Sequence, residues 1–208
     1  MNVYDELKGH VNEYEAFRAE RQKELENINK QGIYSYEGVK RKAEEYSKSI
    51  GEKHKSSMNG FAVRVSILQD KIKETYGKKP DNYDTKLNTA ISIITAAGNG
   101  ATEDDYRKWL APFKHDYDSM RIFAKIIKGD FAIILKRYED MDRVMEMLER
   151  AKANPDRFFK SPVLNPDGKE QTVFDGHPWN TNGSMEFLFF CSLLQEKLDR
   201  LDEFINNF

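Results

Sequence analysis

Histidine and cysteine, the residues that most often carry chemistry, are few in this chain and far apart. The single cysteine, Cys191, falls on the apolar side of a helical pattern, which is typical of a buried thiol. None of the histidines has a second metal ligand at helical spacing, and they lie far from one another: His10, His54, His115 and His177. Phosphate-binding glycine loops and a GxSxG nucleophile elbow are missing too. We therefore expect no catalytic residue, no metal and no cofactor.

One segment has the composition of a binding loop. Residues 174–180 combine turn-forming residues with His177 and Trp179, and an exposed tryptophan offers a partner a large contact area. One alternative is a structural role, in which Trp179 folds back over the core of the last helix. A second alternative is an unrecognised enzyme whose site includes Asp175. We keep His177 and Trp179 as a candidate partner-binding loop.

A row of basic residues forms a second candidate surface. Arg41, Lys48 and Lys55 are seven positions apart, so on a helix they share the face opposite the apolar positions. Such a row could follow the phosphates of nucleic acid. Glutamates interrupt the row, and no aromatic residue shares its face, which favours an ordinary solvated surface. Nucleic-acid binding through these three residues is therefore the alternative expectation.

An apolar seam from Val39 to Tyr76 is the third candidate. Its members recur every three or four positions with an 11-residue period, which predicts a long and nearly straight helix. Either a hairpin within the chain covers this seam, or another chain does so by self-association or docking. The candidate interaction seam is its strongest part, formed by Phe61, Val65, Leu68 and Ile72.

Two long helices at the N-terminus would carry these surfaces. The first should begin after Asn2, a favourable N-cap residue, and end before Gly32. The second should follow Ser35, and its course leaves two alternatives: it is continuous, or it breaks near residues 56–60, where glycine weakens a helix. Because Arg18 interrupts the apolar stripe of the first helix, that stripe is too thin to cover the seam alone.

The remaining sequence predicts further helices and one small β-hairpin. Asn165-Pro166-Asp167-Gly168 is a strong type I turn, and strand-like residues flank it, so we expect a hairpin near residues 162–174. Helical patterns cover five stretches: residues 82–97, 102–111, 116–127, 130–153 and 184–208. Asp130 should cap the fourth of these after Gly129.

The predicted fold class is all-α. A long helical hairpin or coiled coil would occupy residues 1–79, and a helical unit with the β-hairpin would occupy residues 80–208. The boundary falls before Pro80, because the residue preceding a proline disfavours helix and because the charge balance changes there. Residues 1–80 carry 16 basic and 13 acidic side chains, whereas the whole chain carries 33 and 35.

Composition narrows the class of function. The 208 residues are 33% charged and 12% aromatic, and the one cysteine excludes an intramolecular disulfide. No window resembles a signal peptide or a membrane-spanning run, so we expect a cytoplasmic protein without a membrane partner. The net charge of −2 argues against strong general attraction to nucleic acid.

We therefore expect a non-enzymatic helical protein-interaction or assembly factor that self-associates through its helices. In general make-up, the chain is similar to small helical accessory proteins of bacterial viruses, which include chaperone, structural and host-interfering factors.

Overall fold

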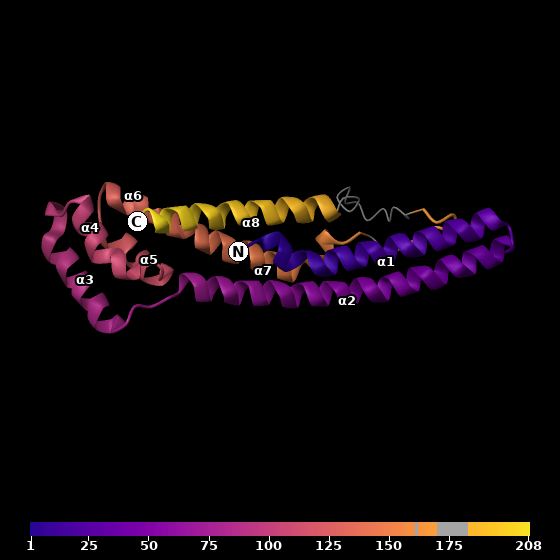
Figure 1. Cartoon of the computed structure of the whole chain (residues 1–208), viewed down its shortest axis with the longest axis horizontal. Helices are drawn as coiled ribbons and strands as arrows, with labels where there is room; N and C mark the ends of the chain where they lie inside the picture. The colour runs from indigo at the N-terminus through magenta and orange to yellow at the C-terminus, as the bar shows by residue number, and fades with distance from the viewer. Residues whose placement is uncertain (161, 170–182) are drawn as a thin grey trace. The chain divides into compact units, whose positions relative to one another are not determined.

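The computed structural model describes residues 1–160, 162–169 and 183–208. These residues are mainly helical and contain no sheet, which confirms the all-α class (Figure 1). The helices are α1 (Val3–Gln31), α2 (Tyr36–Tyr76), α3 (Tyr83–Ala97), α4 (Glu103–Leu110), α5 (Tyr117–Ile126), α6 (Asp130–Leu135), α7 (Glu139–Ala153) and α8 (Gly183–Asn206).

The helix ends follow the capping chemistry of the sequence. The Asn2 side chain accepts a hydrogen bond from the backbone N–H of Asp5 at 3.2 Å, and Gly32 closes α1 in the left-handed conformation, with φ of 62°. The Ser35 hydroxyl accepts from the N–H of Gly38 at 3.2 Å at the start of α2. Thr102 and Asp105 form a reciprocal capping box at α4. Both ends of the connection between α1 and α2 are therefore well defined.

Helix α2 is continuous through residues 56–60, which decides between the two predicted alternatives. Gly60 permits close packing there. A Cβ atom built on Gly60 would lie 2.5 Å from Cε1 of the His10 ring on α1. This glycine therefore gives α1 room to approach α2 and does not end the helix.

The predicted break before Asp130 is confirmed, whereas the predicted helix from Asp130 to Ala153 is divided in the structure. Helix α5 ends at Ile126, α6 begins at Asp130, and a 3₁₀ turn at Lys136–Tyr138 precedes α7. The Tyr138 hydroxyl donates a hydrogen bond to the carbonyl of Lys114 at 2.8 Å, and its ring lies 5.4 Å from that of Phe204. These tertiary contacts hold the turn in place.

The small β-hairpin is not supported. Its turn forms: the Gly168 N–H donates to the Asn165 carbonyl at 2.9 Å, and the Asn165 N–H donates to the Lys169 carbonyl at 2.7 Å. Gly168 has φ of 79°, as the bulge after a type I turn requires. The structure has no strand in residues 162–169, and the predicted second strand, residues 171–174, lies outside the described residues.

The chain divides into two compact units. Unit 1 consists of residues 1–66 and 149–192, and unit 2 consists of residues 67–148 and 193–208. The division differs from the predicted boundary before Pro80, because residues near the C-terminus pack with N-terminal helices in unit 1. The extent of each unit is therefore set by tertiary contacts between segments that are distant in sequence. It does not follow the change in charge near residue 80.

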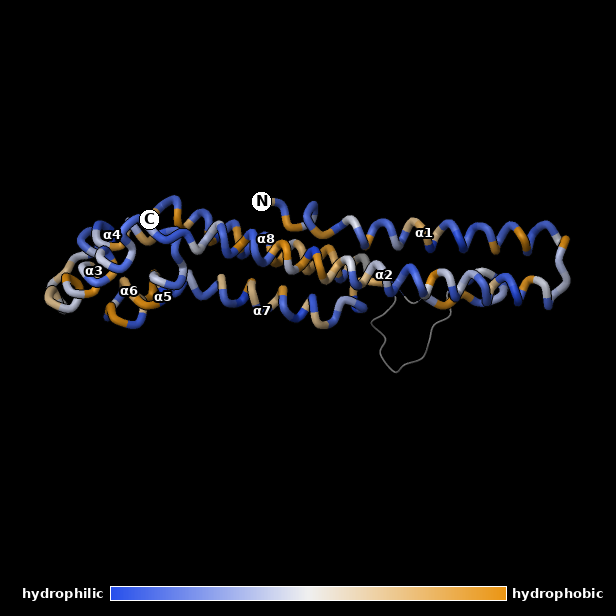
Figure 2. The backbone as a smooth tube through the Cα atoms, turned by 90° about the horizontal axis from the view of Figure 1, so that it is seen from below, coloured by the Kyte–Doolittle hydropathy of each residue, from blue (hydrophilic) through white to orange (hydrophobic). Residues whose placement is uncertain are grey.

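An aromatic cluster forms the core of unit 1. The ring of Phe61 lies 5.3 Å from that of Phe158, 5.9 Å from Phe159 and 6.1 Å from Phe187. On α1, the Tyr14 ring lies 5.5 Å from Phe159, and its hydroxyl donates to the carbonyl of Lys160 at 2.7 Å. Apolar and hydrophilic residues alternate along α1, as Figure 2 shows. Segments after α7 therefore supply the cover that the thin stripe of α1 lacks.

Aromatic packing and side-chain hydrogen bonds hold unit 2 together. Tyr106 stacks on Phe131 with 5.1 Å between ring centroids, and the Tyr76 hydroxyl donates to Asp202 Oδ1 at 2.7 Å. The Arg107 guanidinium donates to the carbonyl of Phe208 at 3.2 Å. These contacts fix the last turns of α8 within this unit.

Candidate interaction site at the hairpin tip

The predicted interaction seam lies in the interior of a single chain. Its four side chains are at most 1% exposed: Phe61, Val65, Leu68 and Ile72. Phe61 packs on aromatic rings of the same chain, as described above. In this structure the seam therefore offers no surface to a second chain, and the alternative of an internally covered seam fits the observed packing.

The predicted basic row is accessible. Arg41, Lys48 and Lys55 are all exposed on α2, and none of them forms an ion pair with a residue in the described part of the chain. Glu44 and Glu52 are exposed between them. The positive row is therefore available to a ligand, although its own helix supplies interspersed negative charge.

The predicted loop, with Asp175, His177 and Trp179, lies outside the described residues. Within the described ranges, no three histidine, cysteine or acidic side chains gather where they could hold a metal ion. Cys191 is 2% exposed, and burial raises the pKa of its thiol to about 12. At neutral pH this cysteine is therefore a buried, protonated thiol and not a poised nucleophile.

Three hydrogen-bonded polar side chains in unit 2 are of residue types that also occur in catalytic sites: Tyr83, Asp116 and Ser119. The Ser119 hydroxyl donates to Asp116 Oδ2 at 2.6 Å and lies 3.0 Å from the Tyr83 hydroxyl. Asp116 and Ser119 are 1% and 0% exposed, so a substrate has no access to them. These hydrogen bonds satisfy buried polar groups at the start of α5, so the three side chains have a structural role.

Three large exposed hydrophobic residues lie at the connection between α1 and α2, and three more lie on the first turns of α8: Met185, Leu188 and Phe189. Ile33, Tyr34 and Tyr36 are 72%, 47% and 75% exposed. Single exposed apolar residues are common on protein surfaces, but three in four consecutive positions of a tight connection form a patch. We call these three residues the hairpin tip. The helix caps at Gly32 and Ser35 hold it at the end of two long helices.

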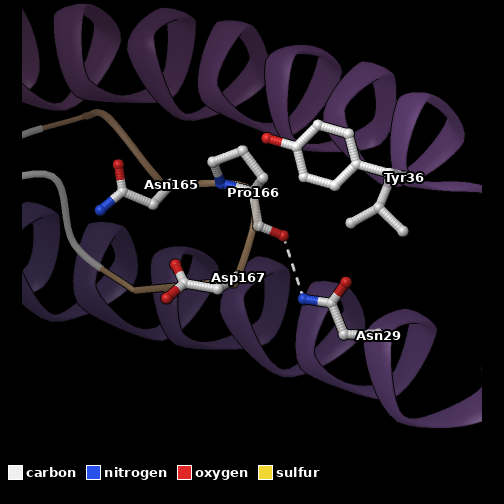
Figure 3. Close-up of a pocket in the computed structure, with 6 residues that line it drawn as sticks. Asn29, Tyr36, Asn165, Pro166 and Asp167 are labelled. Carbon is white, nitrogen blue, oxygen red and sulfur yellow. Dashed lines mark hydrogen bonds between the residues drawn. The ribbon is translucent and has the colours of Figure 1, made fainter.

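A groove opens beside the hairpin tip. It has a volume of about 660 Å³, and its described lining residues come from α1, α2 and the turn after Leu164: Asn29, Tyr36, Val39, Asn165, Pro166 and Asp167 (Figure 3). Val39 is 9% exposed and belongs to a small apolar cluster with Leu25 and Ala43. The groove thus joins an apolar wall to the exposed ring of Tyr36 and the polar turn.

Hydrogen bonds to both helices hold the turn that borders the groove. The Asn29 side-chain amide donates to the Pro166 carbonyl at 3.0 Å, as Figure 3 shows. The backbone N–H of Leu164 donates to the Ser47 hydroxyl on α2 at 3.1 Å. Gly168 lies against α1, since a Cβ atom there would be 3.2 Å from Cγ of Glu26. The groove is therefore formed before any ligand binds.

Our sequence analysis missed this site. The hairpin tip has no helical apolar period, because it lies between two helices. The run Ile33-Tyr34-Ser35-Tyr36 was nevertheless a usable signal, because a polar connection is the usual choice between antiparallel helices. The sequence could not show that Pro166 lines the groove, because this depends on which helices the predicted turn packs against.

Comparisons with known proteins leave the site to be interpreted from its own chemistry. No protein-family model, curated protein or solved structure matches the chain. Among the described residues, none of the helices has the length and apolar character needed to cross a membrane.

Proposed function

We propose that this chain is a non-enzymatic protein-interaction or assembly factor that docks a protein partner through the hairpin tip. The supporting observation is the exposure of Ile33, Tyr34 and Tyr36 beside a preformed groove. Aromatic side chains contribute large contact area to interfaces, and they lose little rotamer freedom when they bind.

Burial of the hairpin tip against a partner should contribute appreciably to the free energy of binding. Complete burial of one large apolar side chain stabilises a complex by about 1.5–3 kcal/mol. Burial of Ile33 and of Tyr36 should therefore each strengthen binding by about tenfold or more, provided that ordering the tip costs little entropy. The caps of α1 and α2 and the anchored turn support that condition.

Site-specific photo-crosslinking in the native cells tests the proposal. A photoreactive phenylalanine analogue replaces Tyr36 in one variant and Glu52, an exposed residue in the middle of α2, in the matched control. We expect a discrete protein adduct at position 36 and none at position 52. Adding Ile33→Asp to the first variant should remove the adduct.

Equal adduct yields at the two positions, or no adduct at position 36, would contradict docking through the tip. An adduct with twice the mass of the chain would identify the partner as a second copy. Self-association would then use the tip and not the seam around Leu68, which is 1% exposed.

Nucleic-acid binding is the second candidate function. It is supported by the exposure of Arg41, Lys48 and Lys55 without ion-pair partners among the described residues. Electrophoretic mobility shifts with duplex and single-stranded DNA test it, and counterion release predicts binding that weakens steeply as salt increases. A triple charge reversal at these positions should abolish the shift. The absence of any shift by the unaltered chain at low salt would reject this function.

A further inference from the structure

We infer that the groove at the hairpin tip recognises a partner segment in which a large apolar side chain lies next to a lysine or arginine. This inference rests on the proposed function and specifies the chemistry of the partner. The apolar side chain would pack between Tyr36 and Val39, and the cation would pair with the Asp167 carboxylate.

Charge selects the partner. Among the described residues that line the groove, Asp167 is the one ionisable group other than the tyrosine hydroxyl. Its side chain is 56% exposed, and its own ion pair is loose: Lys169 Nζ lies 3.7 Å from Oδ2 and the lysine side chain is 80% exposed. Such a pair contributes little stability, so a partner's cation can replace it at low cost.

The apolar wall has room for one large side chain. A cavity of about 660 Å³ lies within the range of small-ligand sites, and it is open beside Tyr36, whose ring is mostly exposed. Helix α2 supplies Val39 to the groove, and an apolar cluster with Leu25 and Ala43 supports Val39 from within. This wall favours an aliphatic or aromatic side chain over a polar one.

The groove is rigid enough to be selective. Three hydrogen bonds described above attach the turn to α1 or close it on itself. The Asp167 Oδ1 atom does accept one local bond, from the N–H of Lys169 at 3.3 Å. Replacing Asp167 by Asn preserves an oxygen acceptor for that bond while removing the charge.

Selection from a displayed peptide library tests the inference. The probe is a random library of peptides of about twelve residues, selected on the full chain and counter-selected on the Tyr36→Asp variant. We expect the enriched peptides to place a large apolar residue within a few positions of Lys or Arg. Fluorescence anisotropy with one such peptide should then show about fivefold weaker binding to Asp167→Asn, as expected for one exposed charge pair.

A charge exchange supplies the control for specificity. Asp167→Lys should bind the cationic peptide poorly and regain affinity for the same peptide with its Lys or Arg changed to Glu. Circular dichroism of both Asp167 variants should match that of the unaltered chain, since the residue lies at an exposed turn.

The failures are distinguishable. Peptides that require Tyr36 but lack a cation, or that bind Asp167→Asn equally well, would overturn this inference and leave the proposed function standing. No enrichment dependent on Tyr36 would overturn the inference, and with no crosslink at position 36 the proposed function would fail as well. Binding to anionic phospholipid vesicles through Tyr36, without peptide enrichment, would identify a lipid surface as the occupant and also overturn the inference.

Discussion

His54 illustrates how a polar residue on an apolar seam is accommodated. Its ring lies 5.2 Å from that of Tyr14 and 5.8 Å from that of Phe159 in unit 1. Burial lowers the pKa of His54 below its usual value of 6.5; the nearby Arg18 lowers it further, and Asp156 opposes the shift. The sequence showed that Arg18 interrupts the apolar stripe of the first helix, but it could not show that Arg18 lies near His54 of the second helix.

Acidification should therefore destabilise unit 1 through His54. As the pH falls below 6.5, the unfolded chain binds a proton at this residue before the folded chain does. The free energy of unfolding should thus decrease between neutral pH and the lower pKa of folded His54. Urea unfolding of the unaltered chain and of His54→Gln, across that pH range, measures the effect. If both proteins lose stability equally, His54 is not the source of the pH dependence.

Cys191 provides a reporter of opening in unit 1. Burial raises the pKa of its thiol to about 12 from a reference of 9.0, so the thiolate fraction at neutral pH falls about a thousandfold. We expect an aromatic disulfide reagent to label the native chain very slowly and the urea-unfolded chain at once. Immediate labelling without denaturant would show that the thiol is not buried as described.

At the scale of elements, the close approach of α1 to α2 depends on a single glycine. Three ring atoms of His10 lie within 2.8 Å of the position that a Gly60 Cβ would occupy. Gly51, on the same helix, has nothing within 4 Å of the corresponding position. Substituting each glycine by alanine therefore distinguishes two effects. Both substitutions raise helix propensity, but only the one at Gly60 disturbs packing against His10.

Gly51→Ala should stabilise the chain by about 0.5–1 kcal/mol, because alanine is the better helix former. Gly60→Ala should lose that gain or destabilise the chain, because the His10 ring must move. Adding His10→Ala to Gly60→Ala should restore a gain relative to His10→Ala alone. The measurement is urea unfolding followed by circular dichroism, and equal gains at both glycines would contradict the described packing.

The elements also mark what sequence could predict. Asn2, Gly32 and Ser35 specified helix ends through local chemistry, and these predictions are confirmed. The turn at residues 165–168 was local chemistry as well. The break at Lys136–Tyr138 was missed, because long-range contacts of Tyr138 accompany it. The groove was missed for the same reason: its walls come from segments more than a hundred positions apart.

At the scale of the whole chain, the two apolar surfaces considered for binding differ in exposure. The seam residues Phe61 and Leu68 are interior, whereas Ile33 and Tyr36 remain mostly exposed after folding. A protein that needed the seam for association would have to unpack its own core, at a high cost in free energy. Association through the tip requires no such change, which is why the proposed function uses it.

Thermal unfolding of Leu68→Glu and Tyr36→Asp, compared with the unaltered chain, tests this division most directly. Leu68→Glu places a carboxylate in an apolar interior and should lower the melting temperature by more than about 10 °C. Tyr36→Asp, at a mostly exposed position, should change it by less than about 2 °C. A Leu68→Glu chain that melts at the original temperature would contradict the account.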